Sequence, residues 1–212
     1  MVRSRAVRLG VLGPSEGELA ALACAALHLV DVAKVDRVVY LGADDALDRV
    51  VAAWARELVG SDPSDELLFV RATRACVNAA PAEVEAFVQA ERARRRLRLF
   101  ATVPPPPGRT IELFDGKIAV LLFDKASLEE DDIAGAALLV FGRSTEPLIH
   151  RVGPRVFLSP GPIGPSSGVL VLDDEGGGIS AELVDAQGGL RRSERIERVA
   201  LTGVKMRVQG AS

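Results

Sequence analysis

The residues best placed for chemistry near the start of the chain lie in the turn at residues 13–17, Gly-Pro-Ser-Glu-Gly. The turn follows an apolar run and precedes an Ala- and Leu-rich segment, a pattern typical of a strand, a tight turn and a helix. Ligands of open α/β sheets bind outside the carboxyl ends of the strands, where such turns lie. This turn is therefore predicted to form the floor of a site, although Pro14, Ser15 and Glu16 offer only a hydroxyl and a carboxylate.

Two familiar chemistries fit this turn poorly. Gly10, Gly13 and Gly17 raise the alternative of a nucleotide cradle, but their spacing is not G-x-G-x-x-G. Glu16 also stands where the backbone would approach a phosphate, and its charge would repel one. A serine hydrolase is disfavoured because His150 has no evident partner in the sequence.

Alternating apolar patterns indicate the elements that would position these residues. Three strands alternating with helices predict a parallel sheet built from βαβ units. The strands are expected at residues 6–12, 36–42 and 66–71, and the helices at residues 16–32, 44–59 and 80–99. Arginines crowd the end of the last helix, where they are predicted to be a solvated helix terminus rather than an anion site; they are Arg92, Arg94, Arg95, Arg96 and Arg98.

The second half of the sequence is mostly β, apart from a helical turn near residues 128–133. Strands are expected at residues 110–114, 117–123, 137–141, 155–158, 168–172 and 179–184, with a further one within 199–208. Asp115-Gly116 predicts a hairpin turn. No long linker separates the halves, so residues 1–212 are interpreted as one domain with a βαβ-type half at 1–100 and a mostly β half at 109–208.

Composition excludes several classes of protein. The chain has 212 residues, 48% of them apolar, and a net charge of −3, which gives no general attraction to nucleic acid or to anionic membranes. No apolar run is long enough to span a membrane. Cys24 and Cys76 show no metal or redox spacing and are expected to be buried thiols in a reducing compartment. These features predict a cytoplasmic protein.

The turns that end the strands follow a recognisable order. They are residues 13–18 (GPSEGE), 41–43 (LGA), 70–74 (VRATR), 122–125 (LFDK), 141–148 (FGRSTEPL) and 159–162 (SPGP). This order resembles the calcineurin-like metallophosphoesterases, specifically the small bacterial single-domain phosphodiesterases, over about residues 6–184. The resemblance implies an α/β fold: an α/β/β/α sandwich of two mixed sheets flanked by helices.

The family's metal-binding positions carry different residues in this chain. A dinuclear site needs carboxylates and imidazoles that converge on two cations. Pro14 has no side-chain ligand, Ala43 lacks the bridging carboxylate, and Arg143 is always protonated. The resemblance places the vestigial site at Pro14, Glu16, Ala43, Asp44, Thr73, Phe123, Asp124, Arg143 and Thr145.

The resemblance and the replaced ligands together predict an inactive member of the fold with no catalytic residue, metal or cofactor. Such a protein would act as an interaction scaffold or regulatory subunit, as the retromer subunit with this fold does, with a protein partner or a second copy of itself. Two alternatives stay open. One is a phosphoesterase with a residual or relocated metal, for which Glu16, Asp44 and Asp124 could gather around one Mg²⁺ or Ca²⁺. The other is a sensor that binds a small anionic ligand in the vestigial cleft.

Charged residues near these turns are expected to replace the metals electrostatically. Arg143 is predicted to reach Glu16 or Asp44 as a buried cation, because its planar fork suits a carboxylate. The full predicted cluster is Glu16, Asp44, Arg71, Arg74, Asp124 and Arg143. Residues 104–107 and 199–208 are the predicted partner surfaces.

Overall fold

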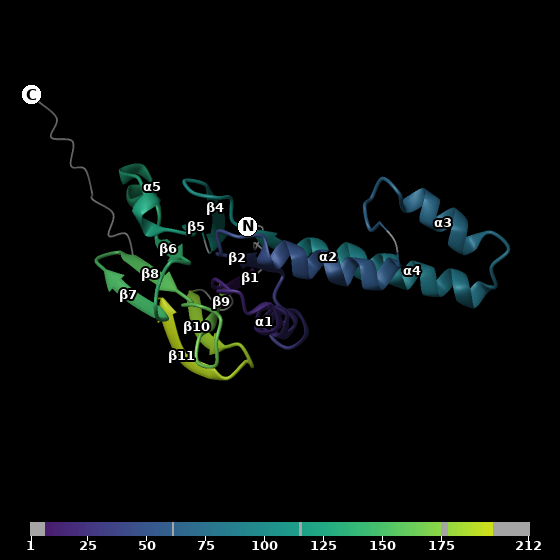
Figure 1. Cartoon of the computed structure of the whole chain (residues 1–212). Coiled ribbons are helices and arrows are strands. Elements are labelled where there is room, and N and C mark those ends of the chain that lie inside the picture. The colour runs from purple at the N-terminus through teal and green to yellow at the C-terminus, as the bar shows by residue number, and fades with distance from the viewer. Residues whose placement is uncertain (1–6, 61, 115, 175–177, 197–212) are drawn as a thin grey trace, which may run out of the picture.

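The computed structural model describes residues 7–60, 62–114, 116–174 and 178–196, which form two packed β-sheets with helices outside them (Figure 1). The first sheet has six strands in the order β11-β10-β9-β1-β2-β3. They are β1 (Arg8–Leu12), β2 (Arg37–Tyr40), β3 (Phe100–Thr102), β9 (Gly168–Asp173), β10 (Ile179–Asp185) and β11 (Leu190–Ile196). β1, β2 and β3 run parallel, whereas β9, β10 and β11 join by antiparallel pairing.

The second sheet has five strands in the order β4-β5-β6-β8-β7. They are β4 (Arg109–Phe114), β5 (Lys117–Leu122), β6 (Leu138–Phe141), β7 (Leu148–Val152) and β8 (Arg155–Ser159). β5, β6 and β8 are parallel, and β4 and β7 close the edges by antiparallel pairing. Both sheets are mixed and helices flank them, which confirms the predicted fold class.

Three clusters of buried apolar residues hold the sandwich together, one of them formed by Val120, Leu139 and their neighbours in the second sheet. Leu9 and Val11 of β1 pack with Leu121, Leu138 and other side chains of the second sheet. These central strands have runs of buried apolar residues rather than strict alternation, as expected of strands covered on both faces. The outer face of the first sheet packs against α1 (Leu19–Asp31) and α2 (Ala46–Val59).

Gly10 allows α1 to pack closely on β1. A Cβ atom at this position would lie 2.7 Å from Cδ1 of Leu29, a buried residue of α1. The glycine therefore has a packing role, and this removes one of the three glycines on which a phosphate cradle would depend.

Residues 66–71 do not form a strand, contrary to the sequence prediction. This region enters α3 (Leu68–Cys76), which packs on α4 (Pro81–Arg96). The run Leu67-Leu68-Phe69-Val70 has only four apolar residues, too few for periodicity to distinguish a strand from a helix. The third strand of the parallel set is β3, which begins after α4 and the short 3₁₀ turn at Leu97–Leu99.

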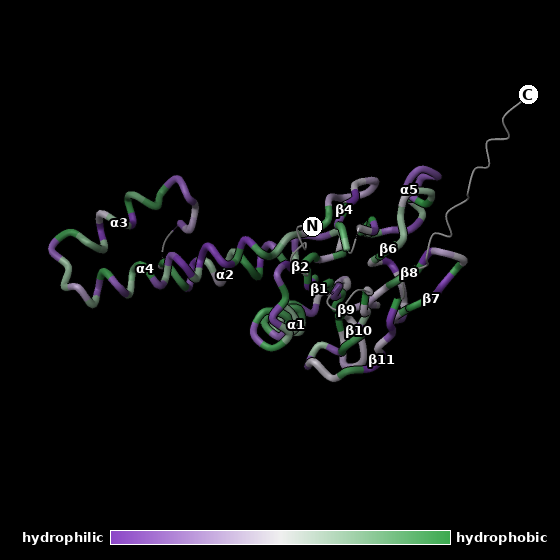
Figure 2. The backbone as a smooth tube through the Cα atoms, turned by 180° about the vertical axis from the view of Figure 1, so that it is seen from behind, coloured by the Kyte–Doolittle hydropathy of each residue, from purple (hydrophilic) through white to green (hydrophobic). Residues whose placement is uncertain are grey.

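The helices α2, α3 and α4 form an arm that projects from the sheets (Figure 1). α2 and α4 run side by side, and α3 lies at the far end of the arm. Figure 2 shows that hydrophobic residues occur there, remote from the two sheets. Within the described part of the chain, no helix is both long and apolar enough to cross a membrane.

Other expectations from the sequence differ in detail. Strands β7 and β11 were not expected, and the helical turn is α5 (Glu130–Gly135). Cys24 is exposed and Cys76 half-buried, so the prediction of two buried thiols is wrong; both are free. The strand expected within 199–208 lies outside the described residues.

Candidate functional site

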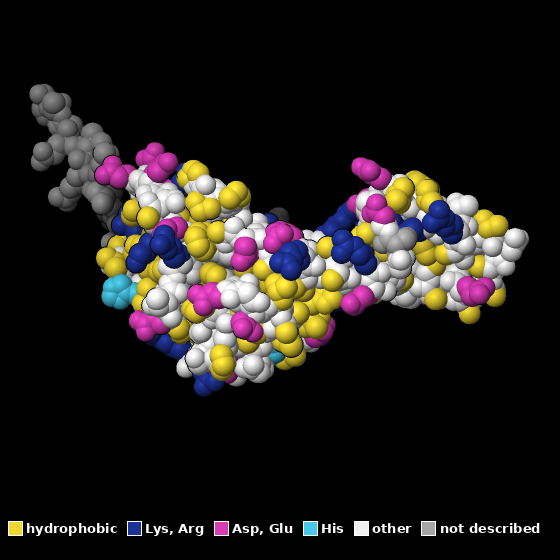
Figure 3. Space-filling view, viewed as in Figure 1, with side chains coloured by type: hydrophobic (Ala, Val, Ile, Leu, Met, Phe, Trp, Pro, Cys, Tyr) yellow, Lys and Arg dark blue, Asp and Glu magenta, His cyan; other side chains and the backbone are white. Residues whose placement is uncertain are grey.

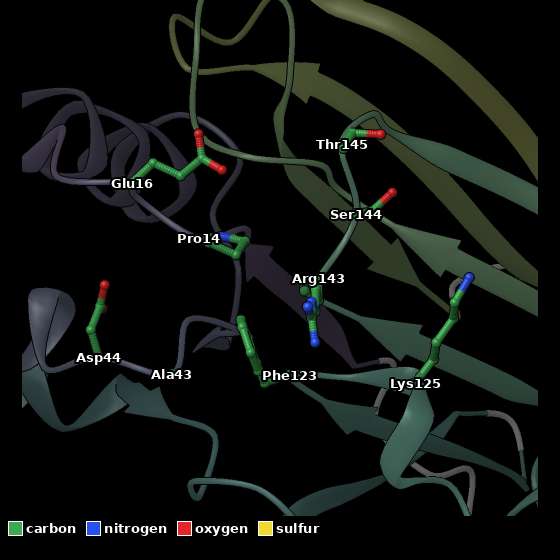
Figure 4. A pocket seen from close by; sticks show the side chains of 10 residues that line it. Pro14, Glu16, Ala43, Asp44, Phe123, Lys125, Arg143, Ser144 and Thr145 are labelled. Atoms are coloured by element: carbon green, nitrogen blue, oxygen red, sulfur yellow. The ribbon is translucent and has the colours of Figure 1, made fainter.

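A cleft of about 640 Å³ opens where strands β1, β2, β5 and β6 end (Figure 4). The carboxyl ends of the parallel strands meet at this edge, and the turns after them approach closely. A Cβ on Gly142 would lie 2.3 Å from the carbonyl oxygen of Leu41, and one on Gly13 would lie 1.8 Å from that of Gly161. Glycine is therefore required at both positions to bring the turns together.

Most of the predicted vestigial positions line this cleft. They are Pro14, Glu16, Ala43, Asp44, Phe123, Arg143 and Thr145, joined by Lys125, Gly142 and Ser144. Asp124 lies beside them through its contact with Arg143.

Thr73, Arg71 and Arg74 lie elsewhere, on α3 in the arm. The Thr73 hydroxyl donates to the carbonyl of Phe69, one turn earlier in the same helix. Because α3 and α4 precede β3, the third strand-ending turn is at residues 103–108 rather than at 70–74. The Val103 N–H donates to the Tyr40 carbonyl, which fixes that turn beside β2.

Arg143 does not act as a buried cation. Its side chain is 70% exposed, and its Nη1 donates to Asp124 Oδ2 over 2.6 Å instead of reaching Glu16 or Asp44. The backbone N–H of Ala126, followed by the Arg143 guanidinium, holds the pKa of Asp124 below its usual range. The predicted replacement of metal charge by a buried arginine is therefore wrong.

Tyr40 lies buried beneath the floor of the cleft, and the sequence analysis did not identify it. The side chain is fully buried, with Oη 2.8 Å from Asp44 Oδ1, and it accepts the Ser15 N–H over 3.0 Å. Burial raises the pKa of Tyr40 to about 12. A Cβ on Gly42 would lie 2.2 Å from the Tyr40 ring. The sequence did contain one indication of this role: Tyr40 ends a strongly apolar strand and is followed two residues later by Gly42.

The walls of the cleft have opposite charges. Glu16 and Asp44 lie on one side, and Lys125 and Arg143 lie on the other with the hydroxyls of Ser144 and Thr145 (Figure 4). Glu16 adopts a left-handed backbone conformation, with φ of 49°. The basic wall can attract an anion, and the acidic wall would repel it.

The donor set does not fit a dinuclear metal centre. Among the described residues, no group of three or more His, Cys, Asp or Glu side chains could hold a metal ion. Asp44 accepts from Tyr40 and from the Ala46 N–H, and Asp124 accepts from Arg143 and the Ala126 N–H. Glu16, Asp44 and Asp124, the three carboxylates considered for a single cation, do not form such a group in the described part of the chain.

A second cluster of charged residues lies in the arm. Glu91 of α4 accepts from Arg71 Nε and from Arg94 Nε, each over 2.7 Å, and all three side chains are at least nine-tenths buried. Arg94 also contacts Asp65 over 2.7 Å. Burial alone would raise the pKa of Glu91, but the two guanidinium groups outweigh it and lower the pKa. Arg94 is therefore not part of a solvated helix end, although Arg92, Arg95, Arg96 and Arg98 are exposed as predicted.

Solved structures share this fold. The chain matches a conserved uncharacterized protein of Streptococcus pneumoniae TIGR4, described as a predicted phosphoesterase, with a TM-score of 0.51 and 14% identity over 92% of this chain and 99% of that one. Vacuolar Protein Sorting 29 of Cryptosporidium parvum matches with a TM-score of 0.47 and 12% identity over 92% and 100% of the two chains. No protein-family model and no curated protein sequence matches. The first of these structures shows that the chain has the fold of the calcineurin-like metallophosphoesterases.

Proposed function

We propose that this protein is a metallophosphoesterase-fold protein that does not hydrolyse phosphoesters and works by binding another protein. The observation that carries the proposal is the composition of the cleft. Pro14, Ala43 and Phe123 line it where the resemblance expects metal ligands, and their side chains have no atom that can bind a metal. Two of the carboxylates nearby, Asp44 and Asp124, already accept hydrogen bonds from the protein.

The exposed apolar residues of the arm also support a role in binding another protein. Several large apolar side chains are exposed at its far end, with Phe69 81% and Val77 62% exposed. Apolar residues gathered on one surface favour an interaction site. The two free cysteines support a reducing, cytoplasmic location for this role.

The test measures hydrolysis and metal binding together. The purified chain is incubated with Mn²⁺ and bis(p-nitrophenyl) phosphate, and Mn²⁺ binding is followed by calorimetry. We expect no turnover above the metal-only blank and no stoichiometric binding. Metal-dependent turnover that disappears in Glu16→Ala but persists in Glu18→Ala, an exposed residue of the same turn, would overturn the proposal.

A second function, recognition of a small anion, is favoured by the basic wall alone. Lys125 and Arg143 stand with the hydroxyls of Ser144 and Thr145 on one side of the cleft. In this case inorganic phosphate would raise the melting temperature of the wild-type chain. The rise should disappear in Lys125→Ala/Arg143→Ala and persist in Arg151→Ala, an exposed arginine outside the cleft.

A further inference from the structure

The helix α3 buries a charge and exposes its largest apolar side chain. Arg71 is its one residue in the buried class, at 6% exposure, whereas Phe69 is 81% and Val70 is 42% exposed. An amphipathic helix ordinarily turns its apolar residues toward the protein. In α3, Leu68 and Ala75 face grooves beside α4, whereas Phe69 and Val70 are exposed to solvent.

Ionic contacts hold α3 in this orientation. Arg71 donates from Nε to Glu91 and from Nη1 to the carbonyls of Asp62 and Ser64, over 2.6 to 2.8 Å. Arg94 ties the same glutamate to Asp65 in the loop before α3. Rolling the helix to bury Phe69 would break these contacts, so the outward apolar face is a fixed feature of the arm.

The outer face is a ridge with opposite charges at its two ends. Glu66, Val70 and Arg74 are spaced four residues apart and are all exposed, so they lie along one side of the helix and the turn before it. Arg74 lies at the edge of this side, where it also borders the groove between α3 and α4. Phe69 and Val77 lie next to this ridge. Among the described residues, neither Glu66 nor Arg74 has an ion-pair partner.

This arrangement is complementary to itself. If two copies of the ridge meet antiparallel about Val70, Glu66 of each copy faces Arg74 of the other, and the apolar side chains meet between them. A two-fold axis brings identical patches together in this way. We propose that the outer face of α3 binds the same face of a second copy of this chain; this rests on the proposed protein-binding role and names the partner.

The shape of the molecule suits this contact. The arm carries α3 away from the sheets, so two copies can meet at their tips while the sheets stay apart (Figure 1). Figure 3 shows hydrophobic side chains on the surface at this end of the arm. A helix of nine residues offers a small patch, at the low end of specific interface sizes. The dimer should therefore form in the micromolar range and depend on concentration.

The first experiment measures mass against concentration for the full chain by sedimentation velocity. We expect the 22.4 kDa monomer to give way to a dimer as the concentration rises. Phe69→Asp should weaken dimerisation at least tenfold, while the circular dichroism spectrum stays unchanged. Leu113→Asp is the matched control, because Leu113 is 63% exposed on strand β4, away from the arm. A monomer at all concentrations, or dimerisation lost in Leu113→Asp and kept in Phe69→Asp, would overturn the inference.

The second experiment tests the antiparallel pairing of charges. Glu66→Arg and Arg74→Glu should each weaken self-association severalfold, and the double variant should restore it. Mixing the two single variants should give a heterodimer tighter than either homodimer, because both end pairs are then oppositely charged. Single variants that associate as the wild type does would contradict this pairing. These results are independent of the hydrolysis assay, so either proposal can fail alone.

Discussion

Arginine has opposite environments in the cleft and in the arm. Arg143 is 70% exposed and contacts one carboxylate at the surface, whereas Arg71 is 6% exposed and meets a carboxylate and two carbonyls. The sequence analysis expected the buried cation in the cleft. The comparison shows that the cleft is lined partly by residues that need no counter-charge, such as Pro14, Ala43 and Phe123. The arm instead buries charge and leaves apolar residues exposed.

The largest expected effect separates the two regions by stability. Glu91→Ala should lower the free energy of unfolding by about 3 kcal/mol, because it leaves two buried guanidinium groups facing each other without their carboxylate. Urea denaturation measures this, with hydrogen exchange of α3 and α4 as the local readout. Glu85→Ala, at an exposed position of the same helix, should change the value by less than about 0.5 kcal/mol. Equal midpoints for both variants would contradict the buried network.

In the cleft the largest effect should come from Tyr40. Tyr40→Phe removes the acceptor of the buried Ser15 N–H and the donor to Asp44, and should cost about 1–3 kcal/mol.

Tyr40 is the chain's only tyrosine, so absorbance near 295 nm reports its ionisation alone. The folded chain should show tyrosinate only toward pH 12, and the urea-unfolded chain near pH 10. Because the pKa of Tyr40 is higher in the folded chain than in the unfolded chain, the protonated Tyr40 hydroxyl contributes its full stabilisation below about pH 10. This contribution to the free energy of unfolding is lost as the pH rises toward 12. Ionisation near pH 10 in the folded protein would rule out the buried hydroxyl.

The contribution of Glu91 in the arm to stability should depend on pH in the opposite direction, being lost as the pH falls. The folded pKa of Glu91 is lowered, so its stabilisation is full above the ordinary glutamate pKa of about 4.3 and is lost as pH falls. Glu91→Gln removes this part of the dependence. The difference in unfolding free energy between the wild type and this variant should therefore shrink below about pH 4. A constant difference across the acid range would argue against an ionised Glu91 in the network.

The smallest effect is expected at Arg143. Arg143→Ala should change the unfolding free energy by less than about 1 kcal/mol, as for other exposed ion pairs. Denaturation alongside Arg151→Ala, an exposed arginine on β7, gives the baseline. A loss near 3 kcal/mol would instead restore the hypothesis of a buried cation in the cleft.

Several features of the fold were predictable because they are local. The run at residues 9–12 and the glycine-containing turn after it predict a buried strand that enters a helix, and the structure has β1 and α1 there. The edge strands β7 and β11 were harder to predict. Only Ile149 in β7 and Ile196 in β11 are buried, and the other residues of these strands are partly or fully exposed. The two strands therefore have only a weak apolar pattern in the sequence.

By itself the sequence determined that the strand-ending turns carry Pro14, Ala43 and Arg143, none of which has a side chain suited to bind a metal cation. Only the tertiary structure decided whether residues 67–70 enter a strand or a helix, because four apolar residues fit both. The partner of Arg71 is Glu91, twenty residues away along the chain, and no local pattern connects the two. The same holds for Ser15 and Tyr40, which are 25 residues apart. Contacts between distant residues depend on how the elements pack, and this is why the arm and the cleft floor appeared only in the folded chain.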